Sequence, residues 1–363
     1  MKIPAVGRSA DDVFAELETF RRGDVPWREG RTLAYVYHPG AEAEAVVKRA
    51  FTMYLTENAL DPTSFPSTLR LENDVVSMAA SHLGGDEHTV GNFTSGGTES
   101  LILAMKTARD FARARRDIRD PEVVLPSTAH ASFQKAAHYL AMKAVIVPVD
   151  PVTFKADVAA MRAAITPRTV LLVGSAPSYA HGVIDPITEL GALALEHGLL
   201  LHVDACIGGF LLPYFRRLGV AVPPFDLRVP GVTSLSMDFH KYGFAAKGAS
   251  TITYRNLDYL KHQMFVYQDW PGGMFASPAL LGTRPGGAYA AAWAAMNNAP
   301  SVLEGFVTFD REALPFDRLY EFMTVYAKFR HMLAVAPEVL TPVGAGRATG
   351  SGGVVPPVPL ETR

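Results

Sequence analysis

The chain has very few of the residues and segments that mark a secreted or membrane protein. Its single cysteine, Cys206, excludes an intramolecular disulfide framework and fits a reducing compartment such as the cytoplasm. No apolar run reaches the roughly 18 residues that a membrane-spanning helix needs. Residues 1–12 lack the hydrophobic core of a signal peptide. We therefore expect a cytoplasmic protein without a membrane span.

An excess of charge of one sign is also missing. The formal net charge over 363 residues is −2, which argues against a nucleic-acid partner and against an acidic disordered tail. No His-x-x-x-His pair with a nearby acid indicates a zinc site. No Gly-x-Ser-x-Gly turn precedes a helix, as it does in many serine hydrolases. The expected class is an enzyme that acts on a small-molecule substrate and needs no metal.

The pattern of apolar residues predicts an α/β fold. From about residue 85 onward, strand-length apolar runs alternate with segments of helical periodicity. This alternation predicts a mainly parallel sheet with helices on both faces, which binds ligands at the carboxyl ends of its strands. The expected helices are 41–57, 69–83, 97–114, 130–142, 156–165 and 187–197, and the expected strands are 122–125, 144–149, 169–174 and 199–203.

The composition divides the chain into three parts. Residues 1–60 hold an amphipathic start, a turn-rich segment and a helix, and residues 61–296 hold the alternating pattern of a large ligand-binding domain. Residues 297–363 are atypical: two short helical patterns precede a stretch rich in Gly and Pro, which we expect to be poorly ordered.

Two polar side chains follow apolar strand-like runs in neighbouring parts of the pattern. Asp204 closes the run 199–203, and Lys241 follows the run 233–237. Pyridoxal phosphate chemistry needs a lysine amine that holds the aldehyde as a Schiff base. It also needs a carboxylate that keeps the pyridine nitrogen protonated. The apolar neighbours of Lys241 suit a desolvated amine of lowered pKa. The alternatives are a structural ion pair for Asp204 and a solvated surface lysine for Lys241.

A glycine-rich turn and two histidines complete the candidate site. The turn 95–98, with Gly97 and Thr98, opens a helix and suits a phosphate, because glycines allow close approach and a helix N-terminus offers free N–H groups. Its alternative is a plain helix cap. His130 either stacks on a flat ring or caps its own helix, and His240 is a candidate donor to the phosphate. Lys247 competes for the Schiff-base role, but its neighbours indicate a turn.

These residues carry a likeness to a known family. Seven strings, in matching order over residues 30–296, closely resemble the sphingosine-1-phosphate lyase branch of the group II pyridoxal-phosphate-dependent decarboxylases. They are Thr94-Ser-Gly-Gly-Thr-Glu-Ser100, His130-Ala-Ser-Phe-Gln-Lys-Ala136, His181-Gly-Val-Ile-Asp-Pro186, His202-Val-Asp-Ala-Cys-Ile-Gly-Gly-Phe210, Asp238-Phe-His-Lys-Tyr-Gly243, Lys247-Gly-Ala-Ser250 and Gly282-Thr-Arg-Pro-Gly-Gly287.

The resemblance implies a fold, a cofactor and roles for single residues. The implied fold is the type I, aspartate aminotransferase-like α/β fold with a mainly parallel central sheet and a small C-terminal domain, incomplete here. The implied cofactor is pyridoxal 5'-phosphate, bound in a homodimer with shared active sites. Lys241 corresponds to the Schiff-base lysine, Asp204 to the partner of the pyridine nitrogen and His130 to the stacking residue. The remaining expected cofactor-binding residues are Gly97, Thr98, Ser175, His240 and, in the other subunit's site, Thr283.

The chain departs from that family at three places. Asp61 stands where the lyases usually place a histidine, and Phe244 stands where they carry a tyrosine. Residues 297–363 do not resemble the family's C-terminal domain, which indicates a truncation or a shifted reading frame. The first two departures bear on how a substrate is handled, and the third bears on whether the chain is active.

The function that follows is a carbon–carbon lyase, which cleaves a phosphorylated amino alcohol by a retro-aldol step through the Lys241 Schiff base. A pyridoxal-phosphate-dependent amino-acid decarboxylase and a truncated, inactive homologue are the alternatives. Aromatic residues are candidates for the path of an apolar substrate tail, with core packing as the alternative. They are Tyr35, Tyr37, Phe65, Phe244 and Phe275.

Overall fold

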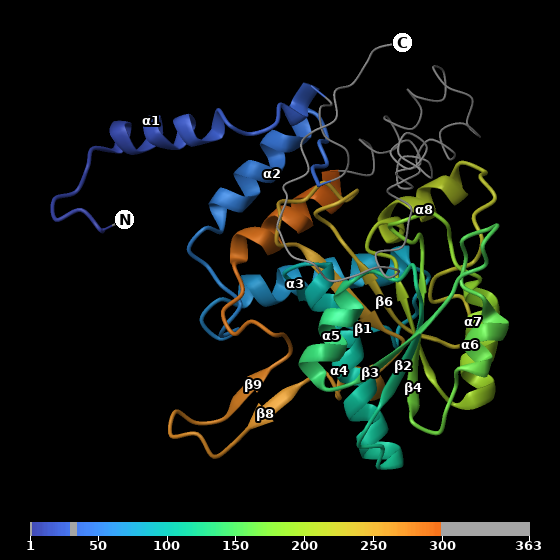
Figure 1. Ribbon diagram of the computed structural model, residues 1–363. Coiled ribbons are helices and arrows are strands. Elements are labelled where there is room, and N and C mark those ends of the chain that lie inside the picture. Colours follow the sequence, from blue (N-terminus) through green and yellow to red (C-terminus); the bar gives the residue numbers. More distant parts are fainter. Residues whose placement is uncertain (1, 30–34, 299–363) are drawn as a thin grey trace, which may run out of the picture.

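The computed structural model describes residues 2–29 and 35–298 (Figure 1). Nearly all of the atypical tail predicted at 297–363, and with it the expected incomplete small domain, lies outside the described residues. The large α/β domain that carries the predicted site lies within them.

A seven-stranded sheet forms the centre of the molecule, in the order β1-β7-β6-β5-β4-β2-β3. β7 runs antiparallel to both of its neighbours, β1 and β6, and the other pairs are parallel. The mainly parallel sheet predicted from the sequence is therefore confirmed. The strands are β1 Val90–Thr94, β2 Glu122–Pro126, β3 Lys143–Val147, β4 Thr169–Ser175, β5 Leu200–Asp204, β6 Val232–Met237 and β7 Ser250–Tyr254.

Helices follow most of the strands, at positions close to those predicted. Neither α8 nor the four-residue α9 was predicted. α8 contains Pro213 and is buried on most sides, so that its sequence shows little helical periodicity. A short hairpin of two further strands was also not predicted. The helices are α1 Ala10–Arg21, α2 Ala41–Met53, α3 Pro66–His82, α4 Gly97–Arg116, α5 Ser132–Leu140, α6 Val158–Ala163, α7 Ile187–His197, α8 Gly208–Arg217 and α9 Leu257–Leu260; the hairpin is β8 Phe265–Tyr267 and β9 Phe275–Ser277.

Alternating side chains of the central strands build one core on each face of the sheet. Val123 and Leu125 of β2 pack with α4 and α5, whereas Val124 of the same strand belongs to the larger core with α3, α7 and α8. Helices thus cover both faces (Figure 1). The strands are fixed between them, and the loops at their carboxyl ends are left to form a site.

Two appendages extend from this body (Figure 1). Helix α1 has no buried residue, and its apolar side chains, among them Phe14 and Phe20, are exposed. The β8–β9 hairpin exposes Phe265 and Val266, and the turn beyond β8 exposes Trp270. Among the described helices, none has the length and apolar character needed to cross a membrane.

Candidate active site

Six of the eight predicted site residues line one cavity of about 380 Å³ at the carboxyl ends of the sheet strands. The other residues around it include Ser95, Tyr179, Cys206 and Asp238. The six are Gly97, Thr98, His130, Asp204, His240 and Lys241. They come from four separate segments at or just beyond strand ends, which the sheet brings together at one edge.

The amine of Lys241 lies against a carboxylate that the sequence reasoning did not use. Lys241 Nζ is 2.9 Å from Asp238 Oδ2, and Asp238 is 1% exposed. Burial lowers the pKa of the Lys241 amine, but the charge of Asp238 more than offsets this, so that the pKa is raised above its ordinary value. The expectation of a lowered pKa was therefore wrong for the protein without cofactor, because it counted desolvation and overlooked the buried counter-charge.

Asp204 is the last residue of β5 and is almost fully buried. Its Oδ1 accepts a hydrogen bond of 3.1 Å from the backbone N–H of Cys206. Its main-chain carbonyl accepts a hydrogen bond of 2.8 Å from the N–H of Ala176, which follows the adjacent strand β4. The backbone of Asp204 is thus fixed at the strand ends, and its carboxylate, held by the Cys206 N–H, lines the cavity.

The glycine turn lies so close to the ends of the strands that Gly97 has no room for a side chain. A Cβ atom on Gly97 would lie 2.7 Å from Cys206 Sγ and 2.9 Å from Asp238 Oδ2. Gly97 and Thr98 open α4, a helix of 20 residues without a side-chain cap at its start. The first N–H groups of such a helix have no intrahelical acceptor, so they are available to an anion in the cavity.

Hydrogen bonds show which ring nitrogen of each site histidine carries the hydrogen. His130 Nδ1 accepts a hydrogen bond of 3.1 Å from the Ser132 N–H, and His240 Nδ1 accepts one of 3.2 Å from the Ala249 N–H. A ring nitrogen that accepts carries no hydrogen, so each neutral ring bears its hydrogen on Nε2. Burial lowers the pKa of His240. His240 is therefore a neutral Nε2–H donor near pH 7.

The competing lysine, Lys247, does not line this cavity. Its Nζ donates a hydrogen bond of 2.9 Å to the His240 carbonyl oxygen and lies 5.0 Å from the centre of the Tyr37 ring. Both contacts hold its amine outside the Lys241 cavity. Its geometry thus favours Lys241 as the amine that faces the cavity.

Two predicted cofactor-binding residues lie away from the cavity. The Ser175 hydroxyl is buried and has no hydrogen-bond partner among the described residues, while its backbone N–H donates to Asp185 at 2.8 Å. Thr283 is exposed on the loop before residues 286–298, which are helical. Neither residue lines the Lys241 cavity within this chain.

A chain of hydroxyl groups links the start of α4 to Asp238. Ser250 Oγ donates to Asp238 Oδ1 at 2.5 Å, and Ser100 Oγ lies 3.1 Å from Ser250 Oγ. Thr94 Oγ1 in turn lies 2.6 Å from Ser100 Oγ. Because the Ser250 proton points to Asp238, Ser100 donates to Ser250 and Thr94 donates to Ser100. Asp238 closes an apolar strand as Asp204 does, and this was the signal from which it could have been found.

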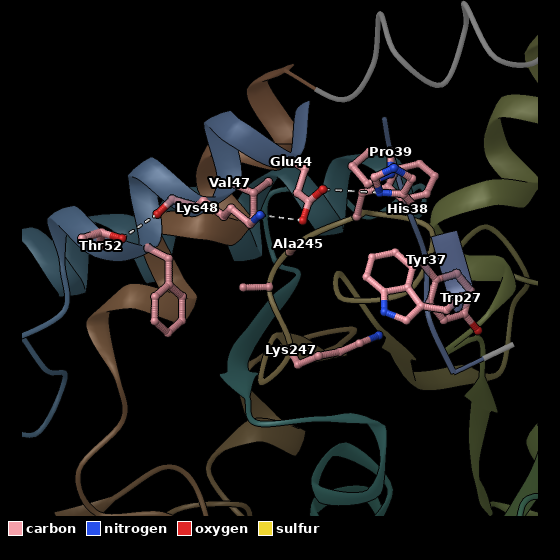
Figure 2. Close-up of a pocket in the computed structure, with 13 residues that line it drawn as sticks. Trp27, Tyr37, His38, Pro39, Glu44, Val47, Lys48, Thr52, Ala245 and Lys247 are labelled. Atoms are coloured by element: carbon pink, nitrogen blue, oxygen red, sulfur yellow. Dashed lines mark hydrogen bonds and ion pairs between the residues drawn. The ribbon is translucent and has the colours of Figure 1, made fainter. Parts of the chain in front are cut away.

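A second cavity, which we call the outer cavity, lies between α2 and the segment 244–247 (Figure 2). Its volume is about 490 Å³. Most of its lining is aromatic or aliphatic, and Glu44, Lys48 and Lys247 add charge. Of the aromatic residues predicted along a tail path, Tyr37 and Phe244 line this cavity, whereas the other three line neither cavity. The apolar lining consists mainly of Trp27, Tyr37, Val47, Phe51, Phe244 and Ala245.

The two side-chain departures from the family have local structural settings. Asp61 is exposed and its Oδ1 accepts hydrogen bonds from the backbone and hydroxyl of Thr63, at 2.8 and 2.7 Å. These bonds lower the pKa of its carboxyl. Phe244 adopts a left-handed backbone, with φ +55°, and its ring lies in the outer cavity. Neither side chain lines the Lys241 cavity.

Comparisons with known proteins agree with this geometry. The family model described as the pyridoxal-dependent decarboxylase conserved domain matches residues 9–270. The chain is similar to the sphingosine-1-phosphate lyase of Arabidopsis thaliana, with 46% identity over 293 residues, which are 78% of this chain and 54% of that protein. It is also similar to a probable L-aspartate decarboxylase of Pyrococcus furiosus, with 34% identity over 88% of this chain and 83% of that protein.

A solved structure shows the same fold. The sphingosine-1-phosphate lyase of Burkholderia pseudomallei superposes with a TM-score of 0.80 and 39% identity, over 82% of this chain and 70% of that one. The chain spans about half the length of the plant lyase that it matches.

Proposed function

The chain belongs to the pyridoxal-dependent decarboxylase family, whose cofactor is pyridoxal 5'-phosphate, and we propose that it is a carbon–carbon lyase for a phosphorylated amino alcohol. The observation that carries the proposal is the convergence of Lys241, Asp204 and the Gly97–Thr98 helix start on one cavity. Identities of 40–46% to sphingosine-1-phosphate lyases over about four fifths of the chain support the substrate class.

The residues of the cavity fit the cofactor. The absence of a Cβ at Gly97 lets the start of α4 approach the strand ends, and its free N–H groups match a phosphate. The buried Asp204 carboxylate matches a protonated ring nitrogen, since a buried charge needs an opposite charge. Lys241 supplies the only amine that lines this cavity among the described residues.

Each side chain then has a defined task. When bound, the cofactor supplies an aldehyde that joins the lysine amine and a ring that accepts the electron pair released by bond cleavage. Lys241 is the point of attachment, and Asp204 holds the proton at the ring nitrogen. The Nε2–H groups of His130 and His240 donate to groups at the mouth of the cavity, which orients the cofactor and the substrate. Tyr179 lines the same cavity and lies beside His130, with ring centres 6.4 Å apart.

The outer cavity is evidence that the substrate has an apolar part. It adjoins the loop that carries Lys241, and its wall of Trp27, Phe51 and Phe244 suits an aliphatic chain. Because Asp61 and Phe244 differ from the usual family residues, we expect weak cleavage of sphingosine 1-phosphate itself.

The test is an analysis of products. Purified, cofactor-loaded protein is incubated with a long-chain amino alcohol phosphate and, separately, with a panel of amino acids that includes aspartate and glutamate. A trapped long-chain aldehyde supports the lyase. Carbon dioxide from an amino acid would instead support the decarboxylase, which the Pyrococcus relative makes the second candidate. Cofactor binding without either product would favour the truncated, inactive homologue. Lys241→Ala is the control for cofactor-dependent turnover.

We also propose a homodimer with shared active sites, in the reducing cytoplasm that suits the single buried cysteine. The exposed apolar side chains of α1 and of the β8–β9 hairpin support an interface, because patches of this kind are rarely left in contact with water. Mixing Lys241→Ala chains with Thr283→Ala chains tests the shared site. Mixed dimers should recover one functional site if Thr283 acts on the partner, and none if it acts within its own chain.

A further inference from the structure

Asp238 is a buried carboxylate to which the proposed function gives no role. It follows the last residue of β6, and its side chain meets groups on three sides. Lys241 Nζ lies 2.9 Å from its Oδ2, Ser250 Oγ donates to its Oδ1 at 2.5 Å, and His240 Nε2 lies 3.7 Å from its Oδ2. Three carboxylates line the cavity, those of Glu99, Asp204 and Asp238, and the lysine faces Asp238. Glu99 accepts hydrogen bonds from the Ser95 and Leu280 backbone N–H groups instead.

Asp204 and Asp238 differ in what holds them, and this indicates different roles. Asp204 is held by a backbone N–H and makes no ion pair with an amine among the described residues. Asp238 is held by the hydroxyl chain through Ser250 and makes the ion pair with Lys241. Given the proposed cofactor, we propose that Asp238 is a positioning residue for Lys241, which holds the amine inside the cavity, protonated, until the cofactor arrives. Asp204 is thereby left for the ring nitrogen.

Among the described groups around Asp238, only Lys241 can serve as its counter-charge. The groups that face Asp238 are Lys241, His240 and Cys206, with Asp204 and Lys247 farther away. His240 is neutral because burial lowers its pKa. Burial raises the pKa of the Cys206 thiol, which therefore carries no charge. Lys241 is consequently the one full positive charge in direct contact with Asp238 within the described part of the chain.

The test measures the reactivity of a single lysine and needs no turnover. The full chain, freed of cofactor with hydroxylamine, is methylated at pH 8 with formaldehyde and cyanoborohydride. Peptide mass spectrometry then gives the methylation of Lys241 relative to the exposed Lys48. In Asp238→Asn, the Ser250 hydrogen bond stays but the counter-charge is lost, while burial still disfavours the ammonium. We expect the ratio to rise at least about tenfold, which corresponds to one pKa unit.

The matched control is Asp204→Asn, which removes another carboxylate of the cavity and should change the ratio much less. Equal ratios in wild type and Asp238→Asn, or an equal rise in Asp204→Asn, would overturn the proposal. The proposed lyase could still be correct in that case, because this measurement is independent of any substrate. Conversely, a protein without lyase activity could still show the tenfold rise.

A second measurement applies if Asp238→Asn does not fold. Lys241→Met leaves the Asp238 carboxylate buried without its counter-charge, and a buried unpaired charge destabilises the folded state. The folded state therefore loses stability as the pH rises and the unpaired charge forms. The Tm of Lys241→Met should fall more steeply than that of wild type between pH 5.5 and 8, and Asp238→Asn/Lys241→Met should abolish the extra slope. Parallel Tm curves for wild type and Lys241→Met would refute the pairing.

Discussion

Two adjacent glycines in the turn before α4 offer a matched pair of substitutions. A Cβ on Gly97 would lie 2.7 Å from Cys206 Sγ and 2.9 Å from Asp238 Oδ2, whereas a Cβ on Gly96 would meet only His240 Cε1, at 3.5 Å. The first contacts are far inside van der Waals distance and the second is ordinary. We therefore expect Gly97→Ala to disrupt the site and Gly96→Ala to leave it nearly intact.

The size of the effect follows from overpacking. An extra methyl group in a well-packed region typically costs about 1–3 kcal/mol. Alanine in a helix is favoured over glycine by up to about 1 kcal/mol. If Gly97→Ala nevertheless lowers the free energy of unfolding, the clash costs more than the higher helix propensity of alanine contributes. If the clash moves the start of α4 away from the strand ends, the same 1–3 kcal/mol weakens cofactor binding by about 5- to 150-fold.

Fluorescence titration of each cofactor-free variant with pyridoxal 5'-phosphate, together with Tm, measures both effects. Cys206→Ala/Gly97→Ala should recover part of the affinity, because it removes the sulfur that the new methyl group meets. The reasoning fails if the two glycine variants bind the cofactor equally well, or if the second substitution gives no recovery.

Three further predictions concern single charges. Borohydride reduction of the cofactor-loaded protein should fix the cofactor mass on the peptide of Lys241, and finding it on Lys247 would refute the assignment. Asp204→Asn should lower turnover by about 10²–10³-fold or more, by analogy with other single electrostatic deletions, and near-normal turnover would make the carboxylate structural. Burial alone would raise the pKa of Glu122, but hydrogen bonds from one threonine, one arginine and one lysine outweigh it and lower the pKa to about 2. Its stabilisation is therefore complete above about pH 4.5 and is lost as the pH falls towards 2. Glu122→Gln should cost about 1–2 kcal/mol in urea unfolding at pH 7, with a difference that vanishes in acid.

The sequence predicts those elements whose burial is one-sided or whose apolar run is continuous. The helix expected at 187–197 is found at Ile187–His197, because its apolar residues keep helical spacing. α8 was missed, since it is buried nearly all round and contains Pro213. β1 was missed because Val-Gly-Asn-Phe-Thr has little strand character by itself. It becomes a strand by pairing with β7, far along the chain.

The same limits apply to the site. Residues at strand ends could be predicted because parallel strands place their carboxyl ends together, and Lys241, Asp204 and His130 indeed line one cavity. The contact of Lys241 with Asp238 could not be judged from spacing alone, because it depends on which way each side chain turns. Thr283 lies away from the cavity within one chain, and its predicted role requires a second copy that no pattern within one sequence describes.

The antiparallel strand β7 has a consequence for how the protein is made. β1 pairs with β7, which is synthesised about 160 residues later in the chain. Until β7 leaves the ribosome, β1 has no neighbour in the described sheet, and the glycine turn that follows it has no fixed position. The parallel strands β2 to β6 can pair earlier, whereas the side of the cavity formed by the glycine turn is complete only after β7 has entered the sheet. A ligand that needs the complete cavity therefore stabilises only a chain in which β7 has entered the sheet.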